Sequence, residues 1–357
     1  MIKKIAVGVL GVLLVGGAVV YSQREAITGK IVERMVGERM GNPLAGLVDG
    51  LHVGLCGTGS PFPDPQRGAP CTLVIAGKRV FLFDAGSGSA KQISRMKFST
   101  GQIQSVFLTH FHSDHIDGLG EIMMTRWAQT TGDERLKVVG PTGVDQVVKG
   151  FEEAYAHDTQ YRIAHHGKTT MVPNLSGAEV QSFDAPAQGL IPVYQDENTA
   201  IEAFRVDHGP VEPAVGYRIR YKDRTVVISG DTKANANLAM AAKDANLLVH
   251  EALSPELVGR LQAIAGEHHR EKLQKIFHDI PNYHTAPDEI AKLAKQAGVQ
   301  NVVLSHIVPP LPLPPMKEMF LGNAPQVFGG PFRIGEDGDL IHLPTGSSQV
   351  EFDRRWQ

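Results

Sequence analysis

The chain has 357 residues, of which 42% are hydrophobic and 20% are charged, and only 2 are cysteines. This length and composition suit one large or two modest folded domains, and exclude a disordered chain, a multispan membrane protein and a disulfide-rich miniprotein. The formal net charge of -3 excludes an overall positive field for gathering nucleic acid, so a polyanion would need a local basic patch.

Residues 1–22 have the composition of a membrane-directed segment. Lys3 and Lys4 precede an uncharged apolar stretch from Ile5 to Tyr21, which as a helix would span roughly 25 Å. We predict a signal anchor or a signal peptide here. Retention is favoured because no small-residue cleavage site is evident, and cleavage is the alternative. The segment predicts a protein that is anchored on the periplasmic side of the bacterial inner membrane or secreted.

Residues 23–50 are predicted to form an amphipathic linker helix. The apolar residues Ile27, Ile31, Met35 and Val36 recur at helical spacing between charged residues. Such a helix would lie on a membrane surface or on the folded domain, and the sequence leaves both alternatives open.

The folded body begins near Leu51, where strand patterns start to alternate with turns and helices. Strands are predicted at Leu51–Cys56, Cys71–Ala76, Arg79–Asp84, Val106–Thr109, Leu136–Gly140, Ile201–Val206, Ala214–Tyr221, Thr225–Ser229 and Leu247–His250. Helices are predicted at Asp117–Thr130, Ala236–Ala245, Arg270–Phe277 and Pro287–Ala297. This order predicts an α/β fold of layered sheets covered by helices.

A cluster of metal-ligating residue types follows the predicted strand that ends at Thr109. His110, His112, Asp114 and His115 lie within six positions, in a chain with 15 histidines. Alternate residues of an extended segment share a face, so His110 and His112 can reach one metal ion, while the following turn brings Asp114 and His115 to a second. Imidazole and carboxylate ligands are typical of catalytic zinc sites.

This motif and the segments around it resemble the metallo-beta-lactamase superfamily, and within it the ribonuclease Z and arylsulfatase-like branch. The resemblance runs from about Leu51 to His306 and includes Gly57-Thr-Gly-Ser60, Phe83-Asp84-Ala-Gly86, Asp207-His208, Ile228-Ser-Gly-Asp231, His250-Glu251, His284-Thr285 and Leu304-Ser-His306. It implies an α/β fold, the αββα sandwich, as a single catalytic domain over residues 51–345, with residues 346–357 as a C-terminal tail.

The resemblance also implies the ligands of two zinc ions, with manganese or iron as alternatives. One ion would bind His110, His112, His208 and Asp231, and the other Asp114, His115, Asp231 and His306.

Three further roles follow from the same resemblance. Asp84 would hold a ligand imidazole by a hydrogen bond, or be a turn residue only. His284 would protonate the leaving oxygen or bind the anionic ester with Glu251 orienting it, or be a surface histidine. Asp114 is assigned a catalytic role beside its role as a ligand.

Cys56 and Cys71 flank the first loop and are either a disulfide or two buried thiols.

The function predicted is that of a dinuclear zinc-dependent hydrolase, in which metal-bound hydroxide attacks a phosphodiester or sulfate ester of a small substrate outside the cytoplasm. Acyl hydrolysis of a beta-lactam or lactone is one alternative, and a ribonuclease Z-like tRNA 3′ endonuclease is another.

Nucleic acid is expected to be an unlikely partner. Residues 140–207 hold four Lys or Arg against ten Asp or Glu, and Ser305-His306 lacks the Ser-x-Arg-Tyr continuation of tRNA-processing members. The remaining predicted partners are a membrane, through the N-terminal segment, and a second copy of the chain in a homodimer.

Overall fold

The computed structural model describes residue 21 and residues 23–356. Gly46–Gln357 form one compact unit, and the preceding residues belong to another. The predicted signal anchor or signal peptide, residues 1–22, lies outside the described residues except for Tyr21. Among the residues described, no helix has the length and apolar character needed to cross a membrane.

Helix α2, Arg24–Met40, occupies most of the segment predicted as an amphipathic linker helix. Its apolar residues Ile27, Ile31 and Val36 are 40 to 52% exposed. The helical pattern in the sequence is therefore present in the structure, and its role as a linker stays a prediction.

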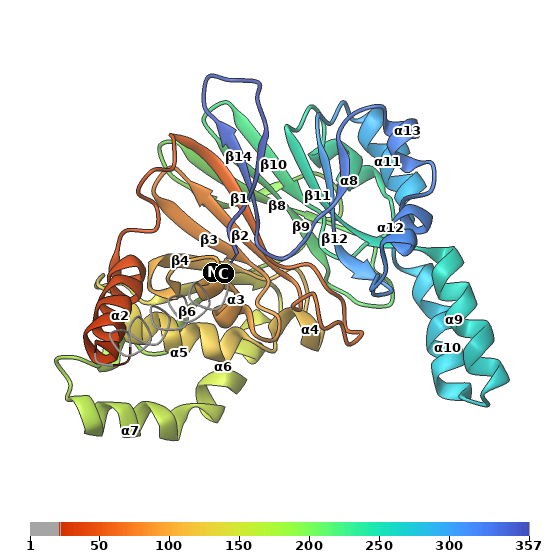
Figure 1. Cartoon of the computed structure of the whole chain (residues 1–357). Helices are drawn as coiled ribbons and strands as arrows, with labels where there is room; N and C mark the ends of the chain where they lie inside the picture. The colour runs from red at the N-terminus through yellow and green to blue at the C-terminus, as the bar shows by residue number, and fades with distance from the viewer. Residues whose placement is uncertain (1–20, 22, 357) are drawn as a thin grey trace, which may run out of the picture. The chain divides into compact units, whose positions relative to one another are not determined.

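Two β-sheets form the centre of the larger unit (Figure 1). The first has eight strands in the order β15 (Glu351–Arg354), β14 (Asp339–Pro344), β1 (Gly50–Gly57), β2 (Cys71–Ala76), β3 (Arg79–Phe83), β4 (Ile103–Phe107), β5 (Leu136–Pro141) and β6 (Ala178–Phe183). The second has seven, in the order β13 (Phe332–Ile334), β12 (Val302–Val308), β11 (Leu247–Leu253), β10 (Arg224–Ile228), β9 (Val215–Tyr221), β8 (Thr199–Arg205) and β7 (Ile191–Gln195).

A shared apolar core lies between the two sheets. In β10 and β11, Val226, Ile228, Leu247 and Val249 belong to this core, whereas Val227 and neighbouring residues face the helices on the other side. Successive side chains of a strand point to opposite faces, so strands that are covered on both faces are apolar at every position. That pattern explains the continuous runs of Val, Leu and Ile in the sequence.

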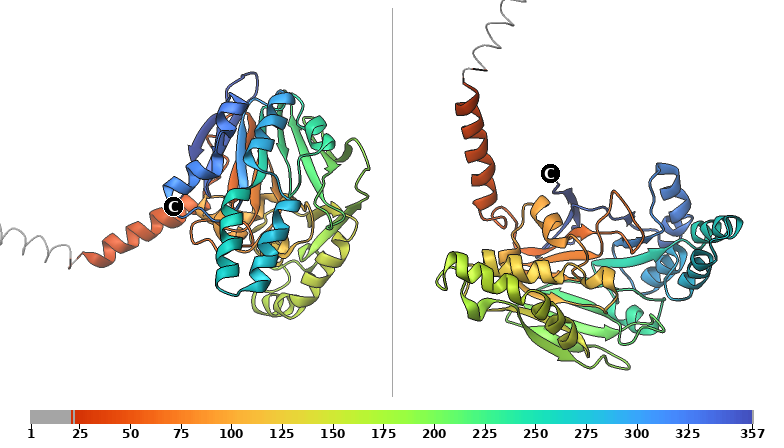
Figure 2. Two further views of the ribbon diagram at one scale, coloured as in Figure 1. Left: turned by 90° about the vertical axis from the view of Figure 1, so that its right-hand side faces the viewer. Right: turned by 90° about the horizontal axis from the view of Figure 1, so that it is seen from below.

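In the sequence, helices follow the strands of each sheet. The helices that follow strands of the first sheet are α3 (Ser89–Arg95), α4 (Ser113–Ile116), α5 (Leu119–Gln129), α6 (Val144–Ala154) and α7 (Ala156–His166). The helices that follow strands of the second sheet are α8 (Ala236–Ala241), α9 (Pro255–Glu267), α10 (Glu271–Asp279), α11 (Pro287–Gln296), α12 (Pro314–Leu321) and α13 (Ala324–Phe328). The second group includes α8, α11, α12 and α13, which cover the outer face of the second sheet, and the α9–α10 hairpin, which projects from the body (Figures 1 and 2).

The predicted two-sheet α/β fold is confirmed, with two local differences. The fourth strand was expected at Val106–Thr109 but ends at Phe107. The Thr109 N–H donates a hydrogen bond to the Asp84 carboxylate at 2.8 Å, and so does not pair with a neighbouring strand. Within the predicted C-terminal tail, β15 extends the first sheet by pairing antiparallel with β14.

Candidate metal centre

The His110 motif occupies the loop and short helix that follow β4. Ser113–Ile116 form α4, whose turn places Asp114 and His115 beside the extended residues His110 and His112, with the His110 and His115 ring centroids 4.1 Å apart. Close backbone contacts fix this loop: a Cβ at Gly86 would lie 2.2 Å from the Asp114 carbonyl oxygen. Only glycine permits this approach, which accounts for the Gly that follows Asp84 and Ala85.

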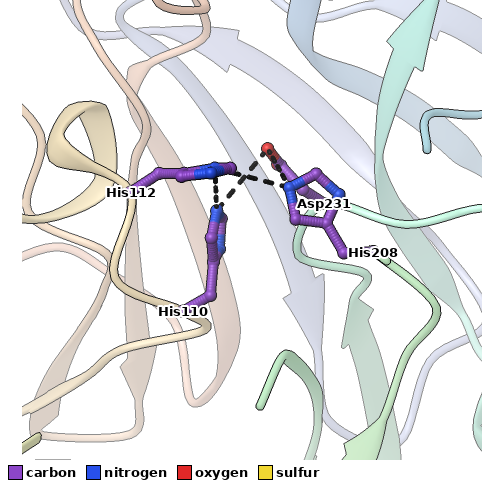
Figure 3. Close-up of side chains that lie close together, drawn as sticks. All are labelled: His110, His112, His208 and Asp231. Atoms are coloured by element: carbon purple, nitrogen blue, oxygen red, sulfur yellow. Dashed lines mark hydrogen bonds and ion pairs between the residues drawn. The ribbon is translucent and has the colours of Figure 1, made fainter. Parts of the chain in front are cut away.

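The first group of side chains comes from three separate segments. Ligand atoms of His110, His112, His208 and Asp231 all lie within 4.8 Å of one another. The Nε2 atom of His110 is 3.0 Å from Nδ1 of His112, and Nε2 of His208 is 3.4 Å from the same atom (Figure 3). Oδ2 of Asp231 lies 3.9 Å from both His110 and His208.

A second group adjoins the first. Asp114, His115 and His306 also have ligand atoms within 4.8 Å of one another. Oδ2 of Asp231 is 3.3 Å from Nε2 of His115 and 3.2 Å from Nε2 of His306. The Asp231 carboxylate therefore contacts members of both groups, as a bridging ligand would.

His306 reaches the centre because of a backbone irregularity. Strands β11 and β12 pair in parallel, with Glu251 opposite Ser305 and Ala252 opposite Ile307, so that His306 is an extra residue in β12. Its φ of +46° lies in the left-handed region, which is costly for a residue other than glycine. Such a bulge re-aims a side chain, and here it turns the imidazole toward Asp231.

Asp84 holds His115 of the second group through Nδ1, the ring nitrogen that does not face the cluster. Its Oδ2 atom accepts a hydrogen bond from His115 Nδ1 at 2.8 Å and from the Thr109 hydroxyl at 2.9 Å. This leaves Nε2 of His115 directed at the cluster, where the buried atom has no hydrogen-bond partner among the described residues. A carboxylate behind a histidine in this way fixes the tautomer of a metal ligand, and a divalent cation suits the donors present.

The charges of the centre also favour a cation. Burial alone would raise the pKa of Asp231, but His306 and His115 hold it well below its usual range. Burial alone would lower the pKa of His115, but Asp231 and Asp84 outweigh it and raise that pKa well above its usual range. Burial lowers the pKa of His208 to about 4, which keeps this imidazole neutral and able to ligate at neutral pH.

His284 is 9% exposed, so it is not a surface histidine, and its ligand atom lies within 4.8 Å of those of Asp231 and His306. Its Nδ1 atom is 3.2 Å from Oε2 of Glu251, and Glu251 is held by the backbone N–H of Thr285, which donates to Oε1 at 2.9 Å. Burial, with the nearby Asp231 charge, raises the pKa of Glu251 well above its usual range, and burial lowers that of His284. Because Nδ1 faces Glu251, Nε2 is the nitrogen available to a substrate.

Sequence reasoning missed residues that hold the first loop. Asp337 accepts hydrogen bonds from the Thr58 N–H at 2.9 Å and hydroxyl at 2.8 Å, and its second oxygen accepts from the Gly68 N–H. Cys56 and Cys71, left open above, form a disulfide that joins the ends of this loop. Asp337 lies far along the chain in an ordinary turn, so no local pattern identifies it.

Comparisons with known proteins match these features. A model of the metallo-beta-lactamase superfamily matches residues 64–265. The ribonuclease Z of Mycobacterium avium (strain 104) is 34% identical over 299 residues, which cover 83% of this chain and 100% of that protein. The structure of the metallo-beta-lactamase fold protein YhfI from Bacillus subtilis gives a TM-score of 0.58 at 18% identity, and covers 83% of this chain and 100% of its own. The short form of human tRNase Z gives 0.57 at 22% identity, and covers 82% and 99%.

Two predictions about the substrate are wrong. Relatives that are 34% and 35% identical, and that are matched along their whole length, are named ribonuclease Z. This finding overturns the small phosphodiester or sulfate ester as the main substrate, and with it the prediction that the partner is a small-molecule ester and that nucleic acid is an unlikely partner. The error was to sum charges along residues 140–207, since a sum over a segment does not give the electrostatic potential at the metal centre.

The predicted location on the periplasmic side of the membrane, or outside the cell, is overturned by the same relatives. It combined an apolar run at the N-terminus with the expectation of a small external substrate, and that expectation is wrong. The membrane contact itself was assigned to residues 1–22, most of which lie outside the described part of the chain.

The prediction of a metal-dependent hydrolase is confirmed, as is the family resemblance on which it rested. The superfamily model covers more than half of the chain, and the ribonuclease Z of Mycobacterium avium matches 83% of it. The chain belongs to the metallo-beta-lactamase superfamily, in which it groups with the proteins named ribonuclease Z.

Proposed function

We propose that this chain is a ribonuclease Z-like endonuclease, which hydrolyses a phosphodiester bond at the 3′ side of a transfer RNA. The observation that carries the proposal is the 34% identity along 100% of a protein named ribonuclease Z. Identity along a whole relative includes the loops around the site as well as the strands, whereas a likeness of fold alone says nothing about the substrate.

We assign one zinc ion to His110, His112, His208 and Asp231, and a second to Asp114, His115, Asp231 and His306. The proximity of these donor atoms and the unpartnered Nε2 of His115 support the assignment. Two bound ions supply Lewis acidity toward a phosphoryl oxygen and lower the pKa of water. All of these residues lie within 51–345, which we propose as the single catalytic domain of an αββα sandwich.

The leaving oxygen of a ribose is a poor leaving group, so a proton donor is needed on that side of the phosphorus atom. We assign this role to His284. We assign Glu251, whose Oε2 atom lies 3.2 Å from Nδ1, to orient the ring so that Nε2 faces the substrate. The Thr285 and Thr232 N–H groups hold the other carboxyl oxygen of Glu251 at 2.9 and 3.3 Å, so the orienting residue is itself held in place.

Asp114 is assigned to the opposite, attacking side. Its Oδ2 atom lies 3.3 Å from Nε2 of His306 and 3.5 Å from Nε2 of His115. Burial would raise the pKa of Asp114, but hydrogen bonding to His306 and the charge of His115 lower it, so the carboxylate is ionised at neutral pH. An ionised carboxylate can accept a proton from the attacking water.

The test uses the zinc-loaded full chain and an unmodified precursor tRNA with a 3′ trailer. We expect cleavage to a single pair of products on a denaturing gel, and loss of that cleavage on chelation of zinc. His284→Ala should lower kcat on this RNA by about 10²- to 10⁴-fold. The loss should be much smaller on bis(p-nitrophenyl) phosphate, whose leaving group needs no proton.

Two results would contradict the proposal. The same sample could hydrolyse bis(p-nitrophenyl) phosphate rapidly and leave the precursor tRNA intact. That result would show that the chain is a hydrolase but that precursor tRNA is not its substrate. Equal losses in the His284→Ala variant on both substrates would exclude the proton-donor role.

A further inference from the structure

A cluster of apolar side chains joins the α9–α10 hairpin to the edge of the candidate metal centre. Its buried members are Leu253, Val258, Ala265, Phe277, Ile280 and Val308, and the partly buried Phe62, Leu261 and Tyr283 pack against it. Phe62 and Tyr283 come from segments more than two hundred positions apart. Both rings are partly exposed, so each presents part of its surface to solvent.

Tyr283 contacts the metal-site histidines directly. Its ring centroid is 5.3 Å from that of His208, with an interplanar angle of 83°, and 5.0 Å from that of His284. Its carbonyl oxygen lies 3.0 Å from Nδ1 of His208, and so accepts the hydrogen bond that orients this imidazole. The tyrosine ring therefore lies at the rim of the centre, held on one side by the histidines.

Phe62 comes from the first loop and packs against the same apolar cluster as Tyr283. Its ring stacks on Phe277 of α10, with centroids 5.7 Å apart and an interplanar angle of 22°. At the base of this loop the Thr58 carbonyl oxygen accepts the N–H of Ile307, the residue after His306, at 2.9 Å. The loop that carries Phe62 is thereby tied to the strand that carries a proposed zinc ligand.

The α9–α10 hairpin carries equal numbers of basic and acidic side chains, since residues 255–283 contain four Lys or Arg and four Asp or Glu. Lys and Arg side chains contact the phosphate backbone of RNA. Aromatic side chains offer a different contact, because unpaired bases of single-stranded RNA stack on exposed rings.

We propose that Tyr283 and Phe62 form a base-stacking subsite beside the metal centre, which receives an unpaired nucleobase next to the scissile phosphodiester. The proposal rests on the proposed ribonuclease function and names how that site recognises its RNA. Stacking on a ring tolerates any base, so this subsite selects unpaired RNA rather than a particular sequence. A double-stranded segment keeps its bases stacked on one another and cannot enter it.

The experiment compares precursor tRNAs that carry either a normal nucleotide or an abasic ribose at the position on each side of the cleavage point. The zinc-loaded wild type should lose about 10-fold in kcat/KM when one of these two bases is removed. Tyr283→Leu and Phe62→Leu should lose about 10-fold on the normal RNA and less than about 2-fold on that abasic RNA. Tyr283→Phe keeps the ring and should recover the preference for the base.

Tyr161→Leu is the matched control, because Tyr161 lies on α7 with its side chain 60% exposed. This variant should retain the wild-type preference for normal RNA over abasic RNA. Zinc content, and the Kd for uncleaved RNA by fluorescence anisotropy, are measured for every variant. The leucine variants should keep their zinc and bind the normal RNA more weakly.

Two outcomes overturn the subsite and differ from failure of the proposed function. Equal losses on normal and abasic RNA would mean that Tyr283 and Phe62 only position His208 and the first loop. Unchanged kcat/KM in both leucine variants would mean that neither ring touches the substrate. If the wild type leaves every RNA uncut, the proposed function and the subsite fail together.

Discussion

Two groups of neighbouring histidines lie in the larger unit of this protein, and only one of them resembles a catalytic site. In the first sheet, His52 of β1 lies directly opposite His342 of β14. Their Nδ1 atoms are 2.8 Å apart, and Nε2 of His52 is 3.0 Å from the Val48 carbonyl oxygen. Both ring nitrogens of His52 therefore have partners, one in β14 and one in the segment before β1.

The histidines of the metal centre are surrounded differently. His115 lies between two carboxylates, with Asp84 at 2.8 Å from Nδ1 and Asp231 at 3.3 Å from Nε2, whereas none of the ion pairs between described residues includes His52. The difference teaches that burial does not mark a functional histidine. Carboxylates around an unpartnered ring nitrogen do, because that combination of donors attracts and binds a cation.

Asp231→Asn should give the largest effect, because one uncharged amide would replace the carboxylate that contacts both groups of donors. We expect metal content to fall below two ions per chain and hydrolysis to fall by at least about 100-fold. Metal analysis of the purified protein and a phosphodiester assay measure the two effects. His52→Asn is the matched variant from the sheet, and it should keep the wild-type metal content and the wild-type rate of hydrolysis. If Asp231→Asn keeps a full metal complement, the bridging assignment is wrong.

Asp84→Asn tests the hydrogen bond behind His115. Asparagine has the same shape and tolerates the φ of +56° at this position, but its amide cannot accept from the Thr109 groups and from His115 Nδ1 as the carboxylate does. Metal affinity should fall about 10- to 100-fold, as measured by competition with a chelator.

Asp337→Asn is the control for Asp84→Asn. It removes an equally buried carboxylate that binds the first loop through Thr58 and Gly68 rather than a metal-site histidine. This variant should lower the free energy of unfolding and leave metal affinity within about 2-fold. Equal losses of metal affinity in the two variants would mean that general loosening, and not the His115 contact, is being measured.

Part of the candidate centre could be predicted from the sequence because four of its proposed ligands lie in one short pattern. His110, His112, Asp114 and His115 lie within six positions, in the loop after β4 and in α4, and this local geometry places them side by side. His208, Asp231 and His306 required the family resemblance, since their approach depends on the pairing of β10, β11 and β12.

Other features could not be predicted because they depend on contacts between distant segments. The bulge that directs His306 is a register shift between two strands, and the sequence Leu304-Ser-His306 contains no glycine or proline to mark it. The α9–α10 hairpin was predicted only in its second half, because the apolar residues of Pro255–Glu267 do not lie on one face: Leu257 and Val258 are buried, whereas Ile264 is 50% exposed. The substrate was mistaken because a charge sum along the chain carries no information on position.

His52 gives the smallest predicted effect, which concerns stability and its dependence on pH. Burial lowers the pKa of His52 to about 4, against 6.5 for an exposed histidine. The unfolded chain therefore binds a proton near pH 6.5 while the folded chain does not until about pH 4, so this histidine contributes full stability above pH 6.5 and loses it as the pH falls through that window.

The sheet variant His52→Asn removes this titration. It should have a lower free energy of unfolding than the wild type at pH 7.0, because the contact with His342 is lost. This gap, the difference in the free energy of unfolding between the two proteins, should be smaller by roughly 1 kcal/mol at pH 5.5. Urea unfolding of the zinc-loaded proteins at the two pH values measures the gap. The metal-site histidines titrate equally in both proteins and cancel in the comparison. A gap that stays constant between pH 7.0 and 5.5 would show that His52 is protonated in the folded protein, and the contrast between a satisfied sheet pair and a cation-binding cluster would then be lost.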